Sequence, residues 1–203
     1  IYTDTFVGSV DVYKRQILIH LGFGSTRNAE NSMIELYEKI CGVKLAYDGV
    51  LAKSQKESEA LWEVREKIPE ANRKIGAIGS HDISLPLSNI STFIDRAQSE
   101  LSKIGQFRIN CFGHLGDGNL HFNVFPESGK TKDQYASQRD VIESLVHDLT
   151  TGLEGSFSAE HGIGRSKVKD LIKYSSPVKL DLMRKLKDLF DPNGIMNPGV
   201  ILK

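Results

Sequence analysis

The 203-residue sequence has few cysteines, no long apolar run and no excess of charge of either sign. Cys41 and Cys111 are its only cysteines, and a chain of this length folds without disulfides, so we expect two reduced thiols in a cytoplasmic protein. The 26 basic and 26 acidic side chains cancel, which removes the attraction that draws basic proteins to nucleic acids or anionic membranes. Because no apolar run reaches the roughly 18 residues of a membrane helix, we expect no transmembrane segment.

Hydrophobic residues make up 39% of the chain and fall into short runs and helical periodicities. Short apolar runs predict strands at 17–21, 43–52, 76–85, 106–112, 120–125 and 155–158. Helical spacing predicts helices at 29–40, 57–68, 89–104, 131–151, 167–174 and 178–190, the second of them ended by Pro69. This alternation, with a hairpin in the second half, predicts an α+β fold of two ferredoxin-like subdomains that share an antiparallel sheet, with closing C-terminal helices.

Two histidines, His114 and His121, flank a glycine-rich segment. On a helix their spacing of seven would place both on one face, but three nearby glycines make a helix unfavourable. A strand, a tight turn and a second strand would bring the two rings together. The alternative is an ordinary hairpin turn at Asp117-Gly118, with both histidines hydrogen-bonded as polar residues at strand ends.

A second segment, residues 158–164, adds a carboxylate and a third imidazole at Glu160 and His161. Two histidines and one glutamate are enough protein ligands for a catalytic divalent metal that keeps one coordination position open. The sequence therefore predicts a metal site formed by two of these three histidines and Glu160.

Five blocks of sequence, in order, resemble a known family. They are LWEVRE at 61–66, DISLP at 82–86, GHLGDGNLHFN at 113–123, SAEHGIG at 158–164 and DPNGIMNPG at 191–199. Together they resemble the C-terminal domain of FAD-linked 2-hydroxyacid dehydrogenases and oxidases of the vanillyl-alcohol oxidase superfamily, most of all members that act on D-2-hydroxyglutarate and D-lactate. The resemblance covers 17–203. Residues 1–16 match nothing in the pattern, and we expect them to be a scar of cloning or assembly.

The resemblance implies a role for eight side chains. It assigns a divalent metal, usually zinc, to His114, His121 and Glu160, substrate contacts to Arg65 and Asn123, FAD contacts to Asn119 and Asn197, and the catalytic base to His161. The implied reaction oxidises a D-2-hydroxy acid to a 2-oxo acid and transfers hydride to FAD. Most of the FAD would be bound by an N-terminal domain that is absent here, so we expect this chain alone to be inactive.

One position departs from the family pattern. Ser80 stands two positions before Asp82, where hydroxyglutarate-specific members carry a lysine, so lactate, glycolate and other 2-hydroxy acids stay open as substrates. Two other functions also stay open: a non-catalytic module that binds a metal or ligand, and a metal-dependent hydrolase that uses the same three ligands. The expected partners are a small 2-hydroxy acid and the absent FAD-binding domain, with a homodimer left open.

Overall fold

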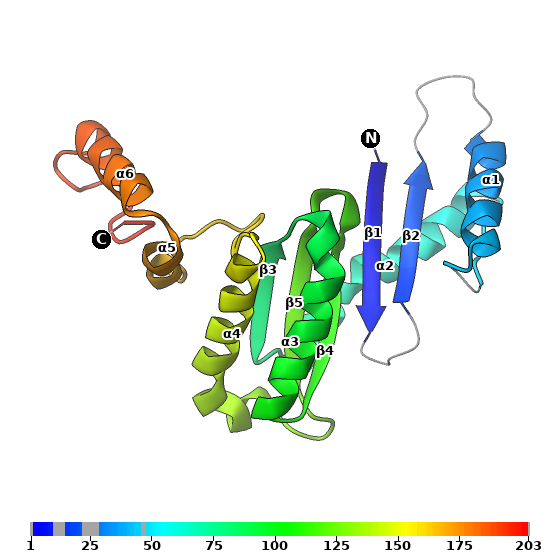
Figure 1. Cartoon of the computed structure of the whole chain (residues 1–203), viewed down its shortest axis with the longest axis horizontal. Helices are drawn as coiled ribbons and strands as arrows, with labels where there is room; N and C mark the ends of the chain where they lie inside the picture. Colours follow the sequence, from blue (N-terminus) through cyan, green and yellow to red (C-terminus); the bar gives the residue numbers. More distant parts are fainter. Residues whose placement is uncertain (1, 10–14, 22–28, 46–47, 203) are drawn as a thin grey trace.

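The computed structural model describes residues 2–9, 15–21, 29–45 and 48–202 (Figure 1). Its strands are β1 (Tyr2–Ser9), β2 (Arg15–Leu21), β3 (Gly79–Ser84), β4 (Phe107–His114) and β5 (Asn119–Pro126). Its α-helices are α1 (Ala29–Gly42), α2 (Gln55–Ile75), α3 (Ile90–Ile104), α4 (Arg139–Gly152), α5 (Val168–Tyr174) and α6 (Pro177–Phe190). Short 3₁₀ helices are η1 (Leu87–Asn89), η2 (Leu115–Asp117) and η3 (Lys132–Gln138).

The strands form one five-stranded sheet in the order β2-β1-β4-β5-β3, and neighbouring strands are antiparallel. β4 and β5 are the predicted hairpin, with ends shifted by one or two residues from the expected positions. The predicted α+β class, the antiparallel sheet and the closing helices α5 and α6 are therefore confirmed.

The stretch that we expected to be a scar contributes β1, which lies between β2 and β4 in the sheet. Thr5 of β1 stands opposite His114 of β4. Residues 1 and 10–14 of this stretch lie outside the described part of the chain. The origin of the stretch stays a prediction.

One face of β3, β5 and β4 is covered by α3 and α4, which carry the green and yellow-green colours of Figure 1. Alternate residues of a strand point to the same face, and on β5 the fully buried Leu120, Phe122 and Val124 point to these helices. The ring of Phe122 meets that of Phe93 on α3 edge to face, with centroids 5.3 Å apart. The main core therefore lies between this face and the two helices, and the residues that alternate with it are left for the opposite face.

α2 is longer than the sequence predicted, because it continues through Pro69 to Ile75. A proline within a helix removes the N–H that would bond to the carbonyl four residues earlier, here that of Arg65. Strong helix formers on both sides, mostly Glu, Lys, Ala and Arg, favour the helix despite this loss. α2 passes behind the sheet in Figure 1, on the side away from α3 and α4. Its Asn72 donates to the Asn110 side chain of β4 at 3.0 Å.

The strand predicted at 43–52 is wrong for the described residues of that stretch, which are turn and coil; residues 46 and 47 lie outside the description. Val43, Leu45 and Val50 are exposed. The described residues of this stretch pair with no strand of the sheet, and β propensity without pairing does not make a strand. The strand predicted at 155–158 is reduced to a single bridge between Ser84 and Ser156.

α5 and α6 lie beside the β3 end of the sheet, and the C-terminus ends next to them (Figure 1). They have a small core of their own, formed by Phe157, Leu171 and Leu180. The chain between α4 and α5 passes by the end of β3, and it carries Glu160 and His161. This route brings the second predicted segment to the sheet.

Candidate metal centre

The face of the sheet opposite the main core carries polar side chains. In the strand register, Asp82 of β3 stands opposite His121 of β5, and His121 stands opposite Phe112 of β4. Directly opposed side chains on neighbouring strands lie about 5 Å apart. The rings of Phe112 and His121 are in contact, with centroids 4.9 Å apart. This row across three strands is the floor of the candidate site.

A tight turn brings the two predicted histidines to one end of this floor. His114 ends β4, η2 makes the turn, and β5 begins at Asn119. Gly118 has φ +67°, and a Cβ there would lie 2.0 Å from the carbonyl oxygen of Leu85. Only glycine fits such a position. The predicted strand, turn and strand are therefore confirmed, and the turn is held against the chain that follows β3.

Asp82 fixes the segment that carries Glu160 and His161. The backbone N–H groups of these two residues donate to its Oδ2 at 2.7 and 2.8 Å, and the side chain of Asn119 donates to its Oδ1 at 3.0 Å. Burial opposes ionisation of Asp82, but these bonds and the nearby His161 ring outweigh it and lower the pKa of Asp82. An ionised Asp82 thus holds strand, turn and loop together.

The three predicted metal ligands come together around Glu160. Its Oε1 lies 3.5 Å from Nδ1 of His114, and its Oε2 lies 3.9 Å from Nε2 of His121. Nδ1 of His114 is buried and has no hydrogen-bond partner among the described residues. Zinc bonds of about 2.0 to 2.2 Å at tetrahedral angles place ligand atoms about 3.3 to 3.5 Å apart. The donor types suit a divalent metal, but among the described residues these three do not offer one ligand atom each that all lie within 4.8 Å of one another.

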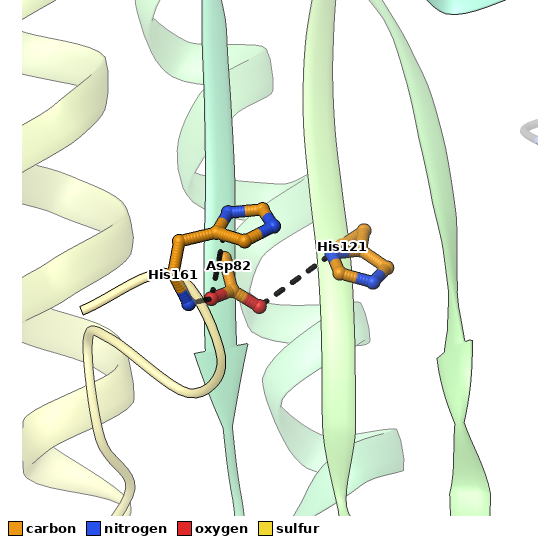
Figure 2. A group of neighbouring side chains, drawn as sticks. All are labelled: Asp82, His121 and His161. Atoms are coloured by element: carbon orange, nitrogen blue, oxygen red, sulfur yellow. Dashed lines mark hydrogen bonds and ion pairs between the residues drawn. The ribbon is translucent and has the colours of Figure 1, made fainter. Parts of the chain in front are cut away.

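A second set of ligand atoms overlaps the first, as Figure 2 shows for Asp82, His121 and His161. The three side chains offer atoms within 4.8 Å of one another. Nδ1 of His161 lies 3.6 Å from Oδ2 of Asp82, and Nδ1 of His121 lies 3.5 Å from Oδ1. The rings of His121 and His161 are stacked, with centroids 5.8 Å apart. His121 is common to both sets, so the sets are alternative coordinations of one site.

Burial lowers the pKa of His121, and nearby Arg65 and His161 act in the same direction. The carboxylates of Asp82 and Glu160 oppose this change without reversing it. The neutral imidazole is the form that ligates a metal, so this environment favours the ligating state of His121.

The two predicted substrate residues both lie at the polar face of the sheet. Arg65 of α2 places its guanidinium 5.2 Å from the centroid of the Phe112 ring, and its buried Nε has no hydrogen-bond partner in the described chain. Asn123 is buried on β5, two residues after His121, and its amide donates to the carbonyls of Asn110 and His121 at the long distances of 3.5 and 3.3 Å. Both groups keep hydrogen-bonding capacity next to the histidines.

The two residues predicted to contact FAD differ in their placement. Asn119 is buried at the start of β5, where its NH₂ group is used by Asp82 and by the carbonyl of Ile83, while its Oδ1 has no partner among the described residues. Asn197 is exposed, with φ +46°, in the turns after α6. Figure 1 places this C-terminal end away from β4 and β5, whereas the backbone N–H of Ile201 donates to the carbonyl of Gly164, in the segment that follows His161, at 2.9 Å.

Sequence reasoning missed Asp82 as a site residue, although it lies in the quoted DISLP block. A carboxylate between the buried residues His81 and Ile83 was the available signal, because a charged side chain within a buried strand needs a partner. Its partners lie far away along the chain, so the sequence alone did not identify them.

A sequence profile of the family "FAD linked oxidases, C-terminal domain" matches residues 12–201 of this chain. Curated relatives include the mitochondrial D-2-hydroxyglutarate dehydrogenase of Bos taurus, which is 40% identical over 81% of this chain and 29% of its own length. The D-2-hydroxyglutarate dehydrogenase of Stutzerimonas stutzeri is 36% identical over 76% of this chain and 33% of its own. The mitochondrial D-2-hydroxyglutarate dehydrogenase of Rattus norvegicus is 33% identical over 90% of this chain and 33% of its own length. The chain spans about a third or less of the length of these relatives.

Several of these relatives are named as mitochondrial proteins, and the bacterial one is not. Among the helices that the structure describes, none is long and apolar enough to cross a membrane. The expected compartment of this chain stays a prediction.

Proposed function

The chain belongs to the family of FAD-linked oxidase C-terminal domains, and from this premise we propose that it is the substrate- and metal-binding part of an FAD-dependent D-2-hydroxyacid dehydrogenase. The observation that carries the proposal is the convergence of His114, His121 and Glu160 on one face of the sheet. A buried Nδ1 of His114 without a hydrogen bond in the described chain is what a missing ligand would leave behind.

A small 2-hydroxy acid is the substrate class that these residues suit. The planar guanidinium of Arg65 can bind a carboxylate with two parallel hydrogen bonds. The amide of Asn123 can orient the same molecule. Ser80 stands opposite Asn123 in the register of β3 and β5 and is exposed. In this proposal the Ser80 position, which lacks the lysine of hydroxyglutarate-specific members, lies where the far end of a longer substrate would reach.

His161 is the proposed proton acceptor. Its Nδ1 faces Asp82, so Nε2 is the nitrogen available to substrate, and the side chain is 68% exposed. An imidazole has an unperturbed pKa near neutrality and can take the proton of the 2-hydroxyl group. A divalent metal would supply Lewis acidity toward that hydroxyl, and FAD would supply the hydride acceptor. Loss of the proton to His161 and of hydride from C2 leaves a 2-oxo acid.

The flavin itself would be bound mostly by the part of the relatives that this chain does not span. We also propose the ferredoxin-like subdomain arrangement, for which the order β3-α3-β4-β5-α4 and the bridge at Ser156 give support in the second half of the chain. The homodimer stays a prediction.

Two single variants test the assignment in the full-length enzyme. Glu160→Gln removes an anionic ligand and should lower metal content and activity together. His161→Asn should keep the metal and slow flavin reduction by roughly 10²-fold to 10⁴-fold, the usual range for loss of a general base. Arg165→Gln, an exposed position in the same segment, is the control and should change neither property.

Other outcomes would replace the proposal. Metal loss in His161→Asn would favour coordination by Asp82, His121 and His161, and a rate within a few fold of wild type would remove the base role. Hydrolysis of simple esters without flavin reduction by any 2-hydroxy acid would indicate a hydrolase. Absence of both activities in a metal-loaded full-length protein would indicate a binding module.

A further inference from the structure

A second group of potential ligands lies on the opposite side of β3 from the candidate metal centre. It consists of Glu143 and His147 of α4 and Asp170 of α5, whose ligand atoms lie within 4.8 Å of one another. Glu143 and His147 are four residues apart on a helix and so share a face. His147 is 1% exposed, and the two carboxylates are partly buried. A buried imidazole between two acids is unlike a solvated acidic patch.

The contact between His147 and Asp170 is close but is not a hydrogen bond. Nδ1 of His147 lies 3.3 Å from Oδ1 of Asp170, yet this buried nitrogen has no hydrogen-bond partner among the described residues. An N–H on Nδ1 aimed at Asp170 would have made one at this distance. Two ligand atoms on a tetrahedral zinc lie about 3.3 Å apart, and both point at the metal and not at each other. The separation of the two atoms matches that of two ligands of a common ion.

His81 of β3 supplies the partner that a ligating histidine needs on its other nitrogen. Nδ1 of His81 lies 3.4 Å from Nε2 of His147. Metal-bound histidines usually donate their second N–H to such a neighbour, which fixes the tautomer. Nδ1 of His81 faces His147 and can accept such a bond in the tautomer that carries its proton on Nε2. Gly79 leaves room for this ring, because a Cβ there would lie 2.7 Å from Nε2 of His81.

We propose that Glu143, His147 and Asp170 form a second divalent-cation site, of the zinc class, that links α4 to α5. One nitrogen and two carboxylate oxygens suit zinc, with solvent at the fourth position because Asp170 is 16% exposed on its side chain. Side-chain shifts of about an ångström would bring the widest pair of atoms to coordination distance. The nearby cation of Lys167 donates to the carbonyl of Phe157 at 3.2 Å and to Ser158 at 3.1 Å, so it is already held by other acceptors.

The position of this site gives it a structural role. The chain between α4 and α5 carries Glu160 and His161, so an ion that links the two helices would hold both ends of that segment. The site lies on the core side of β3, whereas the proposed catalytic metal lies on the other side. The second site therefore does not depend on the proposed function.

Elemental analysis of the purified chain, after loading with zinc and removal of excess, tests the proposal. Wild type should hold two equivalents, and His114→Ala/His121→Ala should still hold one. In that background, Glu143→Gln/Asp170→Asn should abolish the remaining equivalent. These two positions are partly exposed and the replacements keep shape, so circular dichroism should show an unchanged fold.

Asp140→Asn/Asp148→Asn is the matched control. It removes the same charge from this part of the molecule and the ion pair between Asp148 and Lys173, another link from α4 to α5, without touching the proposed ligands. This variant should keep its zinc. Cobalt(II) gives a second measurement, since its visible spectrum should change with Glu143→Gln/Asp170→Asn and not with the control. Retention of zinc by Glu143→Gln/Asp170→Asn, or absence of zinc from His114→Ala/His121→Ala, would overturn the proposal.

Discussion

The two faces of β3, β5 and β4 share one backbone, but one face is apolar and the other is polar. On the face covered by α3 and α4, Leu120 and Phe122 of β5 are 0% exposed and pack against apolar neighbours. On the other face, the alternating positions Asn119, His121 and Asn123 contact polar groups of β3, of the loop that carries Glu160, and of β4, respectively. Residues of β5 that point to the helices therefore stabilise the fold, and residues that point to the other face form the candidate site.

Buried polar atoms without a hydrogen bond mark the two candidate sites. In the described chain such side-chain atoms occur on Arg65, His114 and Asn119 at the first site, on His81 and His147 at the second, and on Gln138 elsewhere. A buried polar group without a partner costs about 1 to 3 kcal/mol. Ligands at the two sites would give several of these atoms the partners that the protein itself does not provide.

The largest expected difference between the faces comes from two adjacent residues of β5. Phe122→Ala removes a fully buried ring and should lower the free energy of unfolding by about 3 to 5 kcal/mol. His121→Ala should cost less than about 1 kcal/mol, because its side chain is partly exposed and its contacts are long, but it should abolish metal binding at the first site. Urea denaturation of both variants measures the loss of stability, and metal analysis measures the loss of metal binding. Equal losses of stability would contradict this prediction.

The hairpin that carries this contrast could be predicted from the sequence. Alternation within 106–112 and 120–125, and the glycines between them, gave β4 and β5 almost residue by residue, and helical spacing gave α3 within one residue of its start. These elements depend on neighbours along the chain. The hypothesis that His114, His121 and Glu160 come together required the family resemblance as well.

The remaining features depend on contacts between distant parts of the chain. β1 is a strand because it pairs with β2 and β4, whereas the described residues of 43–52 pair with no strand. His81 and His147 are 66 residues apart, so no spacing rule joins them. Asp82 acts through partners 37 to 79 residues away. Tertiary contacts, and not local propensity, decide all of these.

A smaller expected effect separates two glycines of the turn that joins β4 to β5. Gly118→Ala would place a Cβ against the Leu85 carbonyl at positive φ, and should cost about 1 to 3 kcal/mol and weaken metal binding, because the turn positions both histidines. Gly116→Ala is the control: the described chain has no atom within 4 Å of its added Cβ, so stability should change by less than about 0.5 kcal/mol. Thermal unfolding and zinc titration of the two variants compare them, and equal behaviour would show that the backbone shifts freely at Gly118.

The smallest expected change in stability accompanies a change in specificity. Ser80→Lys places a cation on the exposed end of the row that contains Asn123, and should leave the free energy of unfolding within about 0.5 kcal/mol of wild type. In the full-length enzyme it should raise kcat/KM for D-2-hydroxyglutarate relative to D-lactate by roughly 10-fold to 100-fold, the range of a charge-assisted hydrogen bond to the distal carboxylate. Ser80→Met has a similar length without the charge and should not shift the ratio. An equal shift in both variants would assign the effect to side-chain size, and no shift in Ser80→Lys would place the distal end of the substrate away from β3.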